Sequence, residues 1–207
     1  MILHGYWRSS AAYRVRIALA LKGVAYEQAT HDLRTGAQGS ADYRSLNPQA
    51  LVPAFEADGD VLTQSPAILE WLEERYPSPA LLPDGAGNRA IVRTMAATIA
   101  CDIHPLNNLR VMRWLKDEGG LDEGRRAEWT RHWIEQGFAA LEAMAGEGPF
   151  LGGDAPDLAD VFLIPQMFNA RRFGVALDAY PKLVAADAAA SALPAFAAAH
   201  PDKVAPR

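Results

Sequence analysis

The segment from Trp7 to Gly23 constrains the fold most, because an apolar stretch changes there into a helical pattern. The residues before Arg8 predict a short buried strand. Helical spacing is kept by Val15, Ala18, Leu19 and Lys22, whereas Arg14 and Arg16 point elsewhere. We therefore expect a strand to turn into a helix at Ser9 and Ser10.

A serine at the start of a helix has two possible roles. Its hydroxyl can simply cap the helix, which is the common structural role. The same helix end also presents unpaired N–H groups and a partial positive charge, which stabilise an anion such as a thiolate. On this segment alone, both roles stay open for Ser9 and Ser10.

The composition is that of an ordinary soluble globular protein. Of the 207 residues, 50% are hydrophobic and 22% are charged, and the net charge is −5. This charge gives no electrostatic footprint for nucleic acid, and no apolar run of about 18 residues could span a bilayer. The N-terminus lacks a basic region followed by an apolar core, so no secretory signal is expected. We expect a cytoplasmic protein with no nucleic-acid or membrane partner.

Cysteine and histidine argue against a metal site. Cys101 is the only cysteine, which excludes an intramolecular disulfide and fits a reducing compartment. The five histidines show no ligand spacing such as H-E-x-x-H. We expect no metal, and we interpret Cys101, Trp129 and Trp133 as core residues.

The order of predicted elements indicates two domains. Residues 1–80 run strand, helix, strand, loop, strand, strand, helix, which is typical of a small α/β unit. Prolines and glycines concentrate in residues 77–88 and mark a linker. Residues 88–207 show no convincing strand and predict an all-helical domain. Within it, Pro105 should bend or split a long helix, and Asp157 with Asp160 predicts a capping arrangement.

Four motifs in this order resemble the glutathione transferases, and specifically their zeta class. They are R-S-S-A-A-Y-R-V-R-I-A-L-A-L-K-G at 8–23, N-P-Q-A-L-V-P at 47–53, T-Q-S-P-A-I-L-E-W-L-E-E at 63–74 and D-L-A-D-x-x-L-I-P-Q-x-x-N-A-R-R-F at 157–173. The resemblance runs from residue 2 to about residue 183. It implies a thioredoxin-like glutathione-binding domain followed by an all-α domain that completes the substrate site, and it also implies a homodimer.

The resemblance implies a glutathione site in the first domain. Val52 would pair its backbone with the cysteinyl part of glutathione, and Pro53 would be a cis-proline. Gln64 and Ser65 would hold the γ-glutamyl carboxylate at a helix start, where orphan N–H groups favour an anion. Without the resemblance, Ser65 is an ordinary N-cap and Gln64 a surface residue. Gln49 is a further implied contact, as is Asn108 from the helical domain.

The thiolate would receive its hydrogen bond from Ser9, with Ser10 as the second candidate. A hydroxyl and a helix terminus lower the pKa of a thiol because they favour its charged form. The sequence departs from the family at Ala11, where most members have cysteine. A thiol-based redox role at this position is excluded, but an isomerase does not need that thiol, since glutathione supplies the nucleophile.

The isomerases of this class act on small dicarboxylates, which need cationic partners. Arginine holds a carboxylate through two hydrogen bonds. The resemblance implies Arg8 and Arg172 as substrate-binding residues, with His104 and Arg110 as further candidates. His104 and Asn108 share a helix face if the helix continues past the proline. The alternatives are that Arg110 and Arg171 are solvated surface charges and that His104 only caps or orients a bent helix.

The implied reaction is the cis–trans isomerisation of maleylacetoacetate to fumarylacetoacetate, a step of aromatic amino acid catabolism. The thiolate would add to the double bond, the resulting single bond would rotate, and elimination would leave the trans isomer, with Arg8 stabilising the negative charge that develops. Three alternatives remain at this point. They are maleylpyruvate isomerisation, glutathione transfer to or dehalogenation of small α-halo acids, and a non-catalytic glutathione-binding protein.

Overall fold

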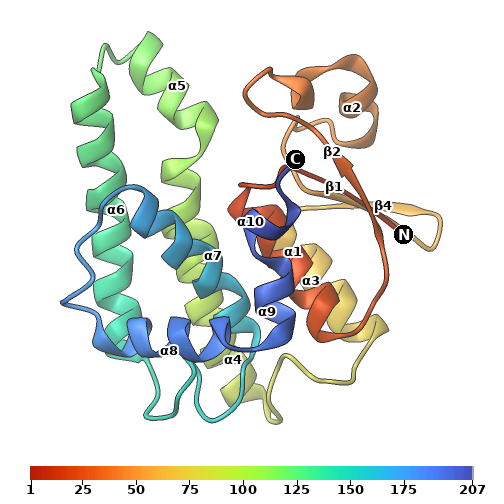
Figure 1. Cartoon of the computed structure of the whole chain (residues 1–207), viewed down its shortest axis with the longest axis vertical. Coiled ribbons are helices and arrows are strands. Elements are labelled where there is room, and N and C mark those ends of the chain that lie inside the picture. Colours follow the sequence, from red (N-terminus) through yellow and green to blue (C-terminus); the bar gives the residue numbers. More distant parts are fainter. Residues whose placement is uncertain (207) are drawn as a thin grey trace. The chain divides into compact units, whose positions relative to one another are not determined.

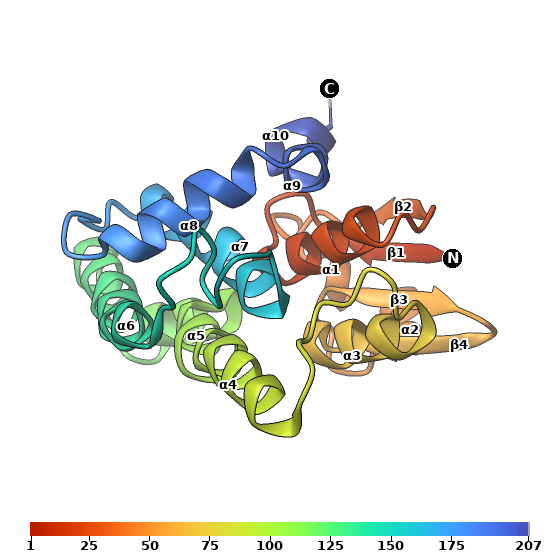
Figure 2. The same cartoon turned by 90° about the horizontal axis from the view of Figure 1, so that it is seen from below.

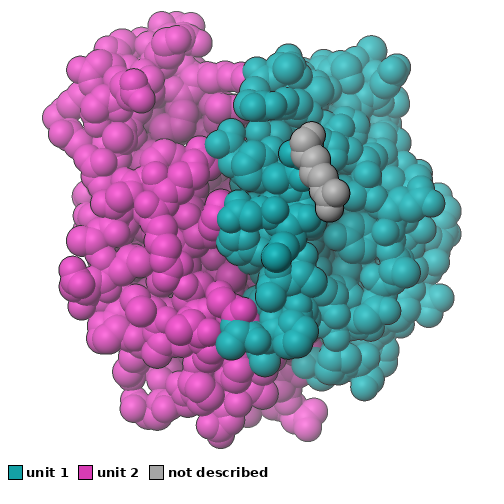
Figure 3. Space-filling model, viewed as in Figure 1, with its two compact units in different colours: residues 1–80, 192–207 teal, residues 81–191 magenta. Residues whose placement is uncertain are grey.

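The computed structural model describes residues 1–206 and divides into two compact units (Figures 1 and 3). The first unit comprises Met1–Ala80 and Ala192–Arg207, and the second comprises Leu81–Ser191. The predicted α/β domain followed by helices is therefore confirmed. We predicted that the helical domain extends over 88–207, whereas the structure groups residues from Ala192 onward with the first unit.

The first unit is built on a four-stranded mixed sheet with the strand order β2-β1-β3-β4. β1 pairs in parallel with β2 and antiparallel with β3, and β3 pairs antiparallel with β4. Leu3 and Phe55 lie opposite each other in this sheet, and both are fully buried. The elements are β1 (Ile2–Gly5), α1 (Ser10–Leu21), β2 (Glu27–Thr30), η1 (Ala37–Gly39), α2 (Ala41–Leu46), β3 (Ala54–Ala57), β4 (Asp60–Thr63), α3 (Ser65–Arg75), α9 (Pro194–Ala199) and α10 (Pro201–Val204).

Helix α1 is buried on every side over its first ten residues. It lies beside α3 and α9, as both cartoon views show (Figures 1 and 2). The Arg16 guanidinium donates to the Ala199 carbonyl at 3.0 Å and to the Trp7 carbonyl at 3.0 Å. This buried arginine connects α1 to the last residue of α9, and α9 also buries Phe196 and Ala199, so the C-terminal residues pack with the first unit.

The second unit consists of helices, with α7 in contact with α4 and α8 (Figure 2). Twelve residues of α7 are buried, from Leu158 to Ala170 with one gap, so it forms the core of the unit. The predicted capping box is confirmed: Asp157 caps α7, and the Asp160 carboxylate accepts from the Asp157 N–H at 3.0 Å. The elements are α4 (Ala86–Ala97), η2 (Thr98–Ile103), η3 (His104–Asn107), α5 (Leu109–Asp117), α6 (Glu123–Met144), α7 (Leu158–Arg172) and α8 (Pro181–Ser191).

The long helix expected before residue 117 is split, as Pro105 predicts. After α4 the chain widens into the π-helical turn η2 and then tightens into the 3₁₀ turn η3. Ile103 packs against Gly137 of α6 so closely that a Cβ at position 137 would lie 2.2 Å from Ile103 Cδ1. A larger residue at position 137 would therefore force the Ile103 side chain to move where these two segments meet.

The core assignment of Cys101 was wrong, because this side chain is exposed. It lies in η2, where only Ile99 and Ile103 are buried. Trp129 and Trp133 are only half-buried and pack edge to face, with ring centroids 5.7 Å apart, and Trp129 donates to the Leu106 carbonyl at 2.9 Å. Across residues 1–206, no helix has the length and apolar character that a membrane crossing requires.

Candidate active site

The serine at the turn into α1 has the capping role. Ser9 is the N-cap, and its Oγ accepts from the Ala12 N–H at 3.2 Å. Because a hydroxyl can accept and donate at once, this bond leaves the Ser9 O–H hydrogen for another acceptor. Ser10 is the first helical residue and is only 9% exposed, whereas Ser9 is half-buried. Of the two candidates, Ser9 is the better placed to meet an anion at the helix end.

The segment before β3 is held in a fixed conformation. The Tyr43 hydroxyl and the Asn47 amide both donate to the Leu51 carbonyl, each at 2.7 Å. Burial raises the pKa of Tyr43 to about 12, so its hydroxyl stays protonated and remains a donor. The Val52–Pro53 bond that follows is cis, the conformation that the resemblance implies. Val52 lies half-buried just outside the ladder that β3 forms with its neighbours.

Three of the predicted glutathione contacts lie together at the start of α3. The Gln64 amide donates to Gln49 Oε1 at 2.6 Å, and both side chains are exposed. Gln64 has a φ of 67°, an unfavourable conformation for a residue other than glycine. Ser65 is the first residue of the helix and is 3% exposed. Its Oγ lies 3.2 Å from Nη1 of Arg14, which is itself 2% exposed.

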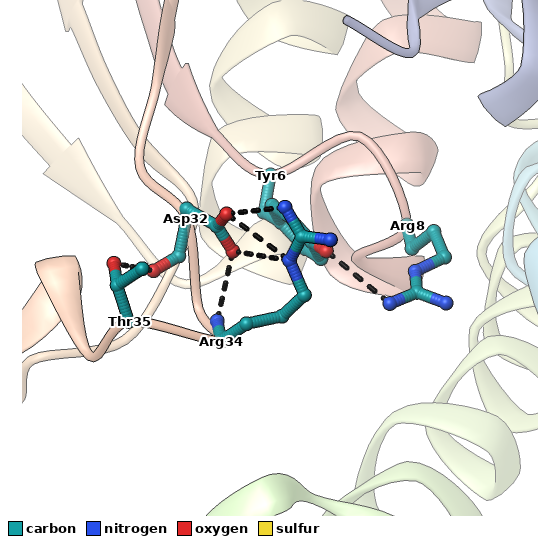
Figure 4. Close-up of polar contacts among 5 residues, drawn as sticks. All are labelled: Tyr6, Arg8, Asp32, Arg34 and Thr35. Atoms are coloured by element: carbon teal, nitrogen blue, oxygen red, sulfur yellow. Dashed lines mark hydrogen bonds and ion pairs between the residues drawn. The ribbon is translucent and has the colours of Figure 1, made fainter.

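Arg8 lies against two aromatic residues of its own segment. Its guanidinium is 4.8 Å from the centroid of the Trp7 ring, and it donates to the Tyr6 hydroxyl at 3.3 Å (Figure 4). Asp32 and Arg34 lie on the loop after β2 and form a two-oxygen ion pair, with a shortest distance of 2.6 Å. Hydrogen bonds from Arg34 hold the pKa of the Asp32 carboxyl below its usual range, and the charge of Arg8 adds to this effect.

The candidates of the second unit lie at the break after α4 and at the end of α7. His104 begins η3, and Asn108 is the N-cap of α5, where its side chain accepts from the Arg110 N–H at 3.1 Å. Because α4 ends before the proline, His104 lies in the 3₁₀ turn η3 and Asn108 has an extended backbone, so the shared helix face expected for these two residues does not form. Arg110 is exposed, so the alternative of a solvated surface charge stays open for it.

Arg172 is the last residue of α7 and is exposed, with its guanidinium 5.0 Å from the Phe173 ring. Its neighbour Arg171 pairs with the buried Asp187 at 2.6 Å, so it is an ion-pair residue and not only a solvated charge. Among residues 1–206, no group of three or more histidine, cysteine, aspartate or glutamate side chains is arranged to hold a metal ion.

Sequence reasoning missed Arg14 and Tyr6. Arg14 was expected to point away from the apolar side of its helix, and the structure buries it beside Ser65. The available signal was the pair of arginines in R-V-R inside an otherwise apolar helix, which indicates that acceptors lie nearby but does not identify them. Nothing in the sequence indicated a role for Tyr6, apart from its position two residues before Arg8.

The chain matches two family models, the glutathione S-transferase N-terminal domain over residues 1–74 and the C-terminal domain over residues 123–201. It is 50% identical to the maleylacetoacetate isomerase of Pseudomonas aeruginosa, an alignment that covers 97% of this chain and 96% of the relative. A solved holo structure of maleyl pyruvate isomerase, described as a bacterial glutathione S-transferase in the zeta class, matches with a TM-score of 0.97 and 46% identity, covering 99% of each chain. The protein belongs to the zeta class of the glutathione transferases.

A further solved structure of this family carries ligands. The maleylacetoacetate isomerase from Methylobacterium extorquens AM1, with bound malonate and glutathione, matches with a TM-score of 0.94 and 43% identity, covering 98% of this chain and 97% of that one. Glutathione is therefore the cofactor of the family to which this zeta-class chain belongs. The first unit offers groups that suit it: a hydroxyl at the start of α1, a cis-proline segment, and a buried hydroxyl at the start of α3.

Proposed function

We propose that the protein is a glutathione-dependent cis–trans isomerase that converts maleylacetoacetate to fumarylacetoacetate. The observation that carries this proposal is the near full-length similarity to a maleylacetoacetate isomerase, combined with the retention of Ser9 at the N-terminus of α1. Glutathione, when bound, supplies the thiol sulfur, which adds to the double bond of the substrate and is eliminated after the bond has rotated. The residues of the chain bind it, set the charge of its sulfur and orient the dicarboxylate substrate.

Ser9 would donate its O–H hydrogen to the sulfur. Its hydroxyl already accepts from the helix, which fixes the oxygen at the point where the orphan N–H groups of α1 converge. Both features favour the charged form of a thiol and lower its pKa. Ser10 is the second candidate for this role and is supported less, because it is more buried.

The glutathione backbone and carboxylate would be held by residues from three segments of the first unit. Val52 would offer its main chain beside cis-Pro53, and Gln64 and Ser65 would bind the γ-glutamyl carboxylate. The exposed Gln49, bonded to Gln64, would close this end of the site. Asn108 is the contact proposed from the second unit.

The substrate dianion would be held by arginines. Stacking on Trp7 and the hydrogen bond to Tyr6 restrict the Arg8 guanidinium, which would bind one carboxylate and stabilise the charge that develops on the ketone oxygen. Arg172 is proposed for the other carboxylate, with His104 and Arg110 as further contacts.

A second candidate function is the same reaction on maleylpyruvate, which is favoured by the similarity to the maleyl pyruvate isomerase structure. The test is the rate of loss of each substrate, side by side, with and without glutathione. A glutathione-dependent rate on maleylacetoacetate that exceeds the rate on maleylpyruvate supports the proposal, and the reverse order assigns the second function. If glutathione binds and neither substrate reacts, the remaining candidates are glutathione transfer to or dehalogenation of α-halo acids, and a non-catalytic glutathione-binding role.

The proposed assembly is a homodimer in the cytoplasm, which the family resemblance supports. Light scattering after size exclusion measures the mass directly. A mass of twice 22.4 kDa is expected, and a mass of 22.4 kDa contradicts the dimer.

A further inference from the structure

We propose that Arg14 is a positioning residue for the carboxylate site at the start of α3. In this role it fixes the Ser65 hydroxyl so that its hydrogen is presented to the γ-glutamyl carboxylate of glutathione. The inference rests on the proposed glutathione function and assigns a role to a residue of α1 that would not itself touch the ligand.

The contact between the two side chains has only one possible direction. Arg14 Nη1 lies 3.2 Å from Ser65 Oγ, and the two residues are 2% and 3% exposed. A guanidinium carries donors and no acceptor, so Ser65 Oγ must accept. The O–H hydrogen of Ser65 is then directed away from the cation. A hydroxyl that could otherwise rotate freely therefore becomes a donor whose hydrogen points away from Arg14.

The Ser65 hydroxyl adds a hydrogen-bond donor at the start of α3, where a backbone donor is missing. Ser65 is followed by Pro66, which has no N–H group, so the first turn offers one backbone donor fewer to an anion. No acidic residue lies in the first turn of the helix, so the positive end of its dipole is not neutralised there. The oriented Ser65 hydroxyl and the buried charge of Arg14 together supply what the proline removes.

The next arginine of the helix serves as an internal control. Arg16 is equally buried, at 1% exposure, but it donates to the main-chain carbonyls of Ala199 and Trp7. Burial lowers the pKa of Arg16 to about 10, so it stays charged at neutral pH. The helix thus holds two buried arginines with different partners, and only Arg14 contacts a proposed glutathione residue.

The test compares two ligands. One is glutathione, and the other is 4-aminobutyryl-cysteinyl-glycine, which is glutathione without the carboxylate of its γ-glutamyl group. Dissociation constants are measured by calorimetry for the wild type, Arg14→Gln, Arg14→Lys, Arg16→Lys and Ser65→Ala, with circular dichroism to establish that each variant is folded. Arg14→Lys keeps the charge and serves as the milder change if Arg14→Gln does not fold.

Arg14→Gln is expected to weaken glutathione binding about tenfold, the effect of one hydrogen bond to a charged group, and to change binding of the analogue less than about twofold. Arg14→Lys should recover part of the loss, because it keeps the charge without the planar guanidinium. Arg16→Lys should change both ligands by the same factor. In a Ser65→Ala background, the Arg14→Gln change should weaken glutathione binding by a smaller factor than in the wild type, because only the contribution of the charge remains.

Two results would overturn the inference while leaving the proposed function intact. Equal weakening of both ligands by the Arg14 variants would mean that Arg14 acts only on the fold. An undiminished effect of Arg14→Gln in the Ser65→Ala background would mean that it does not act through this hydroxyl. A wild type that does not bind glutathione at all would overturn the proposed function and this inference together.

Discussion

Lys22 Nζ lies 2.8 Å from Glu73 Oε2, with the lysine side chain fully buried and that of the glutamate 10% exposed. The same ammonium also donates to the carbonyls of Tyr76 at 2.6 Å and Pro79 at 3.0 Å. All three of its hydrogens therefore have acceptors. One side chain at the end of α1 connects the end of α3 to the segment that leaves the α/β core of the first unit.

Lys22→Met is expected to lower the free energy of unfolding by about 3 kcal/mol or more, because it removes the ammonium that faces a buried carboxylate. Urea unfolding measures the change. The control is Arg125→Met, which breaks the pair with Glu128 between two exposed side chains and should cost less than about 1 kcal/mol. Equal effects of the two substitutions would show that burial of the Lys22 pair has no energetic consequence.

Gly137→Ala should destabilise the second unit by about 1–3 kcal/mol, because the new Cβ would overlap Ile103. The control is Gly87→Ala in α4, where nothing lies within 4 Å of the added Cβ; alanine there should be neutral or stabilise the helix by about 0.5–1 kcal/mol. Thermal unfolding distinguishes the two. Equal stability of Gly137→Ala and Gly87→Ala would contradict the close approach of the Ile103 side chain to position 137.

The buried carboxylate of Asp160 should give a stability that depends on pH. Burial raises its pKa to about 7, although it accepts from two N–H groups. The unfolded side chain has a pKa near 3.8, so between about pH 4 and 7 folding takes up a proton, and the free energy of unfolding falls as pH rises. The slope should approach at most about 1.4 kcal/mol per pH unit.

The measurement for Asp160 is the difference in unfolding free energy between the wild type and Asp160→Asn at several pH values. The difference cancels titrating groups that do not interact with Asp160, such as His31, whose pKa is lowered by burial and then by the charge of His4. Asp157 is coupled to Asp160, and burial raises its own pKa to about 6, so the measured slope reports the two carboxyl groups together. A wild type that loses stability relative to Asp160→Asn as pH rises from 4 to 7 agrees with the prediction. A constant difference contradicts it.

Arg8→Ala should reduce kcat/KM for the isomerisation about 10²–10³-fold, the effect of removing one donor that stabilises developing charge. Tyr6→Phe removes only the 3.3 Å hydrogen bond that supports Arg8 and should cost about tenfold or less (Figure 4). Both rates are measured at saturating glutathione. The assignment fails if Arg8→Ala keeps the wild-type rate, or if Tyr6→Phe is the more damaging change.

Local signals were enough to predict several elements that carry the proposed glutathione and substrate contacts. The turn into α1, the Ser65-Pro66 start of α3 and the capping box of α7 each depend on residues within a few positions of one another. The roles of Arg14 and Arg16 were beyond such signals, since their partners Ser65 and Ala199 lie 51 and 183 residues away. A sequence pattern places a side chain on a helix face but does not identify what packs against that face.

The break after α4 was predicted only in part. A proline inside a helix predicts an interruption, but it does not say whether the chain widens, tightens or bends. The structure widens into η2 before Pro105 and tightens into η3 around it, which separates His104 from the face that Asn108 would have shared. The close approach of Ile103 to Gly137, on another helix, accompanies this geometry, and nothing near the proline in sequence reveals it.

The most direct test of the central claim is the glutathione-dependent isomerisation rate of Ser9→Ala against the wild type, with the pKa of bound glutathione measured from thiolate absorbance. The account predicts a folded variant that binds glutathione, with a raised thiol pKa and a rate lowered by about tenfold or more. Ser10→Ala, the matched variant one residue on, should retain most of the rate. Wild-type rate and thiol pKa in Ser9→Ala would contradict the claim that this hydroxyl activates the sulfur.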